Sequence, residues 1–154
     1  MSSTHVFLSR FTCLLLAPFL VVASARAENA TATISLNAGM HIIRAEVVNT
    51  MASRSQGLMF RKSLGPNQGM LFVFDVSERH CMWMKNTLIP LSVAFVDEQG
   101  VILNVVEMKP QTEDTHCARG QARYALEMTE GWFSKRGLQA GLRLGGIDKA
   151  PGPK

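Results

Sequence analysis

The sequence has none of the short motifs that mark the commonest catalytic sites. It contains no G-x-S-x-G elbow, no H-E-x-x-H pair and no glycine-rich phosphate loop, so it matches no α/β-hydrolase, zinc protease or nucleotide-binding pattern. After residue 27, lysine and arginine never occur in a run longer than two. A nucleic-acid interface needs a clustered basic surface. We therefore expect no nucleic-acid partner and assign no catalytic residues.

The sequence also has no apolar run of the roughly 20 residues that a membrane-spanning helix needs. The run over residues 11–22 follows Arg10 and leads to Ala25-Arg26-Ala27, the layout of a secretory signal peptide with an A-x-A cleavage site. An uncleaved anchor is the alternative. We expect residues 1–27 to be removed, which lowers the formal net charge from +4 to +2 because two arginines leave. The protein is then exported to the periplasm or beyond the cell, with no stable membrane insertion.

Cysteine is scarce, with three in the chain. Cys13 lies in the expected signal peptide, which leaves Cys81 and Cys117. In an oxidising compartment, two cysteines in a small domain are expected to form a disulfide. Free or metal-binding thiols are the alternative.

Short apolar segments separated by turn residues make up most of the chain after residue 27, and only two segments favour helix. Strands are expected at residues 34–36, 40–48, 70–74, 81–91, 91–96, 101–108 and 122–128, and short helices at 50–56 and 129–136. Residues 138–147 are expected to form a tight turn at Gly141 and a final strand. This pattern predicts a mainly-β fold, a compact antiparallel β-sandwich or barrel-like domain with two short helices. Residues 28–39 are expected to be a flexible leader and first strand, 40–147 the single domain and 148–154 a tail.

Residues 81–91 place polar side chains in an otherwise apolar segment that we expect to be a strand. A buried amine or amide without a hydrogen bond costs roughly 1–3 kcal/mol. These side chains therefore either form a structural polar network or face a cavity in which a ligand binds. We interpret them as part of a candidate ligand site formed by Arg61, Trp83, Met84, Lys85, Asn86, Thr87 and Glu127.

Several motifs together resemble one family. They are Gly57-Leu58-Met59 with Arg61, Gly69-Met70-Leu71-Phe72 with Phe74, Trp83-Met84-Lys85-Asn86-Thr87 with Ile89-Pro90-Leu91, Pro110, and Tyr124 with Leu126-Glu127. Over about residues 40–147 the chain is similar to the bacterial and archaeal "domain of unknown function 192" family. The resemblance implies a compact mainly-β sandwich, often exported, with no established activity. Ser92 departs from the pattern because the family usually has Asp there, which puts a carboxylate role at this position in doubt.

These observations favour a non-catalytic binding or accessory module of the cell envelope. We expect a monomer without cofactor that binds a small molecule, a glycan or a peptide. A small hydrolase that uses Lys85 and His116 is the first alternative. A copper-binding protein is the second, because soft ligands are frequent, although no residue is assigned to a metal. The candidate soft ligands are Met59, Met70, His80, Cys81, Met82, Met84, His116 and Cys117.

The disulfide prediction can be tested by alkylation of the purified protein. If Cys81 and Cys117 are paired, an alkylating reagent should block both thiols only after reduction, as counted by intact mass. Reaction of both thiols before reduction would contradict the pairing and would favour the metal-binding alternative.

Overall fold

The computed structural model describes residues 31–154, so the expected signal peptide lies outside the described part of the chain. In chain order its elements are β1 (Thr33–Ala38), β2 (His41–Val48), α1 (Met51–Gln56), β3 (Gln68–Glu78), β4 (Cys81–Met82), β5 (Leu91–Val96), β6 (Ile102–Met108), β7 (His116–Cys117), β8 (Ala122–Thr129), the 3-10 helix η1 (Ser134–Arg136), β9 (Leu144–Gly145) and the 3-10 helix η2 (Ile147–Lys149). Over residues 31–154, no helix is both long and apolar enough to cross a membrane.

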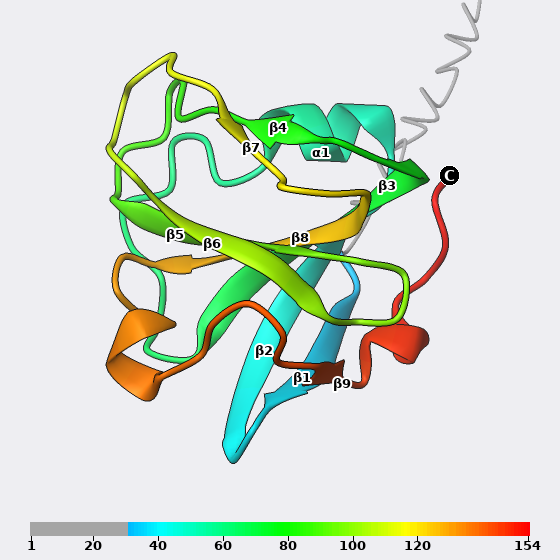
Figure 1. The fold of residues 1–154 in the computed structure, drawn as a ribbon. Coiled ribbons are helices and arrows are strands. Elements are labelled where there is room, and N and C mark those ends of the chain that lie inside the picture. Colours follow the sequence, from blue (N-terminus) through cyan, green and yellow to red (C-terminus); the bar gives the residue numbers. More distant parts are fainter. Residues whose placement is uncertain (1–30) are drawn as a thin grey trace, which may run out of the picture.

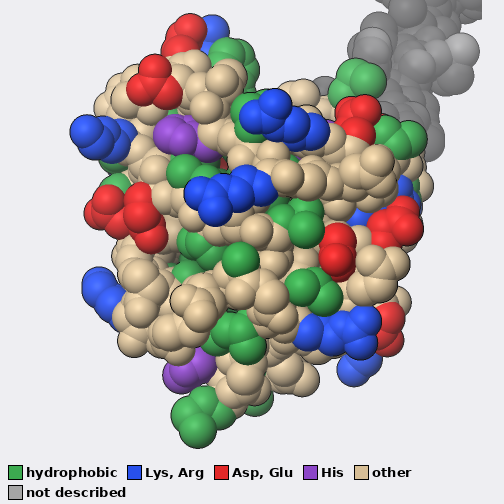
Figure 2. Space-filling view, in the orientation of Figure 1, with side chains coloured by type: hydrophobic (Ala, Val, Ile, Leu, Met, Phe, Trp, Pro, Cys, Tyr) green, Lys and Arg blue, Asp and Glu red, His purple; other side chains and the backbone are tan. Residues whose placement is uncertain are grey.

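Seven strands form one curled sheet in the order β6-β5-β8-β3-β2-β1-β9, and β4 pairs with β7 in a small second sheet (Figure 1). Every strand pair is antiparallel except β2 with β3, which α1 connects. The predicted mainly-β class is therefore confirmed. On the face shown in Figure 2, basic and acidic side chains are interspersed around the apolar ones.

The first expected helix is confirmed. The hydroxyl of Thr50 accepts a hydrogen bond from the Ser53 N–H at 3.0 Å, and the Ser53 hydroxyl accepts one from the Thr50 N–H at 3.1 Å. This reciprocal capping box fixes the start of α1, and Gly57 ends it. The second segment differs from the prediction because only the 3-10 helix η1 forms there, before Gly137.

At the centre of the sheet both faces are buried, each against its own apolar cluster. β3 shows this best, since Met70 to Phe74 are all buried, as expected for a strand covered on both sides. The first core contains Leu36, Ile43, Val47, Leu71, Val73, Leu126, Met128, Trp132, Phe133, Leu138 and Leu144 among others. The second core contains Val48, Leu58, Met70, Phe72, Phe74, Met84, Leu91, Val93, Phe95 and Ala125 among others. The segment after β8 covers the first core, and the chain between β2 and β3 helps to cover the second.

The expectation of one strand over residues 81–91 is wrong. Only Cys81–Met82 forms a strand there, and residues 83–90 form a loop that leads into β5. The Thr87 N–H donates to the Met84 carbonyl at 3.0 Å, and Asn86 has a φ of 56°, so the chain turns there. A turn, unlike a strand, lets Met84 and Thr87 point inward while Lys85 and Asn86 stay exposed.

The structure contains the predicted disulfide between Cys81 and Cys117. The two residues are directly opposite each other in the β4–β7 pair, and the bond joins positions 36 residues apart. It therefore holds the start of the 83–90 loop against the long connection between β6 and β8.

Ser92 of β5 hydrogen-bonds a carboxylate from the neighbouring strand β6. Its hydroxyl donates to Glu107 Oε2 at 2.5 Å and accepts from the Gly131 N–H at 2.8 Å. The same Gly131 N–H lies 3.1 Å from Glu107 Oε2. Ser92 and Glu107 together anchor the turn that leads into Trp132 and Phe133.

Close approach of β3 to β8 requires glycine at position 69. A Cβ added to Gly69 would lie 2.6 Å from the Glu127 carbonyl oxygen and 2.3 Å from Met128 Sδ.

We expect Gly69→Ala to lower the free energy of unfolding by about 1–3 kcal/mol, because the backbone has to shift. Denaturant unfolding measures this effect. Gly120→Ala is the control, because its Cβ would meet only the Leu103 side chain at 3.7 Å. Equal effects of the two substitutions would contradict the close approach.

Candidate functional site

A small cavity lies on the second-core side of the sheet, where α1 ends and the 83–90 loop begins. Its volume is about 30 Å³, and its lining residues are Arg54, Ser55, Gln56, Gly57, Leu58, Met59, Phe72, Met82, Trp83, Thr87 and Glu127. A space of this size holds about one or two water molecules. It therefore admits the tip of a ligand, while the rest of the ligand stays on the surface.

Glu127 is the buried carboxyl group of this cavity. It lies on β8 between Met70 of β3 and Val93 of β5, and it is 3% exposed. Within residues 31–154 its carboxyl group takes part in no hydrogen bond and no ion pair, and its oxygens are not sealed off but reach the cavity. Burial raises its pKa from 4.5 to about 8, because desolvation disfavours the charged form. Near neutral pH the carboxyl group is therefore mostly protonated.

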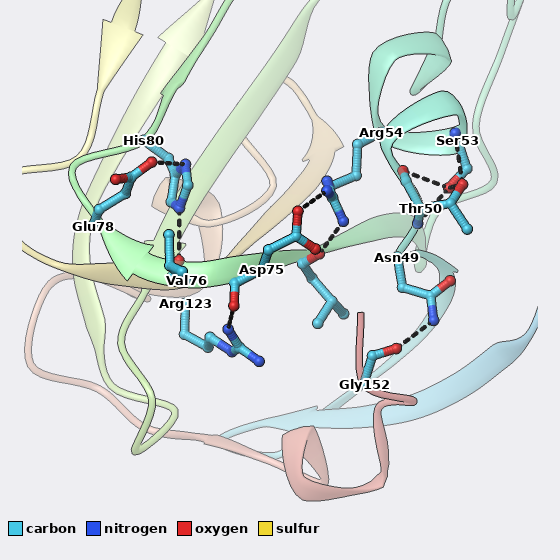
Figure 3. A network of polar contacts seen from close by, with 11 residues as sticks. Asn49, Thr50, Ser53, Arg54, Asp75, Val76, Glu78, His80, Arg123 and Gly152 are labelled. Atoms are coloured by element: carbon cyan, nitrogen blue, oxygen red, sulfur yellow. Dashed lines mark hydrogen bonds and ion pairs between the residues drawn. The ribbon is translucent and has the colours of Figure 1, made fainter. Parts of the chain in front are cut away.

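The end of α1 forms one wall of the cavity. Gly57 has a φ of 46°, and a Cβ there would lie 3.0 Å from Phe72 Cζ, so glycine lets the end of the helix approach β3 closely. Arg54 holds the same helix to β3: its guanidinium donates to the Val73 carbonyl at 2.9 Å and pairs with Asp75 at 2.6 Å, as Figure 3 shows. The charge of Arg54 is thus already paired.

Two loops meet beside the cavity, next to its lining residues Met59 and Thr87. The Phe60 N–H donates to the Asn86 carbonyl at 2.9 Å, and both residues are left-handed, with φ of 63° and 56°. Left-handed residues other than glycine store strain and concentrate at binding and catalytic sites. Trp83 stands beside this junction, lines the cavity and is 45% exposed. Its ring is a partly open apolar surface next to the buried carboxyl group.

The structure brings three of the seven candidate residues to the cavity, namely Trp83, Thr87 and Glu127. Met84 is fully buried in the second core and does not line the cavity. Arg61 pairs with Glu46 at the surface.

Lys85 and Asn86 are exposed outside the cavity lining. The Lys85 ammonium lies 3.6 Å from Glu113 and 5.2 Å from the centre of the Trp83 ring. The Asn86 amide lies 4.0 Å from Met59 Sδ.

The sequence interpretation missed the wall that α1 forms. Arg54 lies in α1 and Gly57 ends this helix, and Phe72 is an ordinary core position by pattern. The sequence around Gly57 indicates that a helix ends there. It does not indicate which strand the end of the helix packs against. Only the tertiary contact between α1 and β3 identifies these residues as cavity lining.

The residues of the two alternative functions have other contacts. Lys85 pairs with Glu113, and no hydrogen bond or ion pair joins it to His116, whose buried Nε2 has no partner in the described chain. The ring of His80 stacks on Phe74 at 3.7 Å, and both cysteines are in the disulfide. Over residues 31–154, His, Cys, Asp and Glu form no group of three or more that could hold a metal ion.

Comparison with known proteins gives a family and a fold. The model of the DUF192 family, described as "Uncharacterized ACR", matches residues 32–146. A crystal structure of a protein of unknown function from Novosphingobium aromaticivorans is 30% identical, with a TM-score of 0.70 over 73% of this chain and 84% of that chain. One from Sinorhizobium meliloti, described as a proposed transcription regulator, is 32% identical, with a TM-score of 0.68 over 73% and 91%. No curated protein matches the chain.

The pKa of Glu127 makes stability depend on pH. The unfolded chain loses this proton near pH 4.5, whereas the folded chain keeps it until about pH 8, so the folded state binds more protons in between. Stability conferred by the protonated carboxyl group is therefore present below pH 4.5 and is lost as pH rises through this window. Relative to Glu127→Gln, the free energy of unfolding should fall by at most about 1.4 kcal/mol per pH unit.

Denaturant unfolding of both proteins across this range measures the difference. Glu127→Gln is the matched control because it keeps the shape of the carboxyl group and cannot ionise. A difference that stays constant with pH would show that Glu127 ionises as it does in the unfolded chain.

Proposed function

Since the chain belongs to the DUF192 family, whose description assigns no activity, we propose that it is an exported binding module that recognises its ligand at the Glu127 cavity. The observation that carries this proposal is the buried carboxyl group without a partner. The carboxyl oxygens reach a cavity that has room for one or two water molecules. A ligand group that takes this place and donates a hydrogen bond to the carboxyl group would be held there.

The surroundings of the cavity supply the rest of a ligand site. Trp83 is 45% exposed, and Phe60, on the loop that hydrogen-bonds Asn86, is 65% exposed. Exposed aromatic rings next to a small polar cavity suit a ligand that places one polar tip in the cavity and its body on the surface. A sugar, a peptide or another small molecule can meet this description.

The lining of the cavity favours binding over catalysis. General acid–base chemistry needs titratable groups placed to act on the substrate together. Besides Glu127, the charged lining residue is Arg54, whose guanidinium is held by Val73 and Asp75. Glu127 therefore has no second acid or base beside it in the lining.

Two observations support export to the periplasm or beyond the cell. The sequence before residue 28 has the layout of a signal peptide, although this part lies outside the described residues. The disulfide between Cys81 and Cys117 is the kind of bond that persists in oxidising compartments.

The proposal is tested by mapping ligands onto the purified protein with amide NMR. We expect monosaccharides, short peptides or small polar compounds that bind to shift the signals of Gly57, Trp83 and Thr87, which line the cavity. Trp83→Ala should remove these shifts, because it removes the exposed ring. Leu88→Ala is the control, since Leu88 is an exposed apolar residue of the same loop that does not line the cavity. Shifts that map elsewhere, or no shifts with any compound, would refute the proposal.

A further inference from the structure

The carboxyl group of Glu127 can accept a hydrogen bond from a ligand. Side chains with donors also line the cavity, namely those of Arg54, Ser55, Gln56, Trp83 and Thr87. Arg54 donates to Val73 and Asp75, and Thr87 to the Lys85 carbonyl, so neither of these two is bonded to Glu127. A donor on the ligand can therefore reach this carboxyl group.

The charged side chains around the cavity form ion pairs with one another, whereas Glu127 forms none in the described chain. Arg54 on α1 pairs with Asp75, Arg61 on the following loop pairs with Glu46, and Lys85 on the 83–90 loop lies beside Glu113. Lys62 lines a separate depression with Pro90 and Glu130. Glu46 lies in the same lateral row of the sheet as Glu127, with Met70 between them, and its charge is balanced by Arg61. Of Asp75, Glu46, Glu113 and Glu127, Glu127 is the one that forms no ion pair within residues 31–154.

The Trp83 ring also favours a cation. The ring already holds the Lys85 ammonium at 5.2 Å from its centre, which is within cation–π range. The Trp83 ring at the opening of the cavity can therefore attract an ammonium group. Apolar lining side chains such as Met82 can contact the methylene groups of the ligand.

The size of the cavity sets the kind of cation. About 30 Å³ holds roughly one or two water-sized groups. An –NH₃⁺ group with its first methylene fits this space. A trimethylammonium group or a guanidinium has more heavy atoms at its charged end and matches this space less well.

We propose that the Glu127 cavity binds a primary ammonium group carried on an apolar stem. This inference rests on the proposed function and names the chemistry of its ligand. On binding, the Glu127 carboxyl group releases its proton to solvent, and the ammonium N–H groups donate to the resulting carboxylate. A lysine side chain, a chain N-terminus and an amino sugar all carry such a group, so the test includes a probe for each.

The first experiment is a calorimetric titration of the purified protein with n-butylamine at about pH 6 and about pH 7. Because binding releases one proton when the pH is below the pKa of Glu127, the affinity for n-butylamine should rise about tenfold as the pH rises by this one unit. The neutral analogue n-butanol and the bulky butyltrimethylammonium should each bind at least about tenfold more weakly, which is the factor that one lost charge-assisted contact provides.

Variants connect this binding to the cavity. Glu127→Gln, which is isosteric with the protonated carboxyl group, should bind n-butylamine more weakly and with no dependence on pH. Leu88→Ala should bind n-butylamine as the parent protein does. Trp83→Ala should weaken n-butylamine without changing the pH dependence. The same titration with Nα-acetyl-lysine amide, glycinamide and glucosamine then distinguishes the three sources of the amine.

The outcomes separate this inference from the proposed function. If n-butanol binds as well as n-butylamine, or if affinity for the amine does not change with pH, the ammonium inference is wrong. The binding module itself stands in that case, provided that a neutral compound still shifts the signals of Gly57 and Thr87. If no amine and no neutral compound perturbs these signals, both the inference and the proposed function are wrong.

Discussion

A sheet whose centre is buried on both faces is the constraint on which the rest of this structure depends. The middle of strands β3 and β8 has no solvated side, so connecting segments have to cover each face there. The segment after β8 covers the first core with Trp132 and Phe133. The second core receives Leu58 from the end of α1 and Met84 from the loop after β4. These two covering segments meet at the cavity, and Glu127 is buried there because this part of its strand has no exposed side.

The cavity exists because these segments are held from several directions and do not close over Glu127. The disulfide and the β4–β7 pair hold the loop that carries Trp83, and the Arg54–Asp75 pair holds the end of α1. The two left-handed residues Phe60 and Asn86 connect the loops by a single backbone hydrogen bond. Such strained positions persist only when the surrounding contacts fix them. The cavity is thus bordered by segments that are fixed independently, which is how a rigid recognition site is built.

The sequence predicted the elements whose signal is local. The capped helix before Gly57, the buried strand around Phe72 and the hairpin that turns at Gly100 each depend on neighbouring residues, and all three form. The prediction of a strand over residues 81–91 was wrong because a short mixture of apolar and polar residues is compatible with a strand and also with a turn that buries Met84 and Thr87. The contact between Arg54 and β3 could not be read from the sequence, because it joins segments whose approach is set by tertiary packing.

Glu107 and Glu127 show how environment assigns different roles to the same side chain. Glu107, on edge strand β6, accepts from the Ser92 hydroxyl and the Gly131 N–H, so its carboxylate has a structural task. Glu127, on inner strand β8, has no comparable hydrogen bond, and an apolar residue of similar volume would pack there without the cost of desolvation. A carboxyl group that costs stability and anchors no neighbouring segment is best explained by something that binds to it.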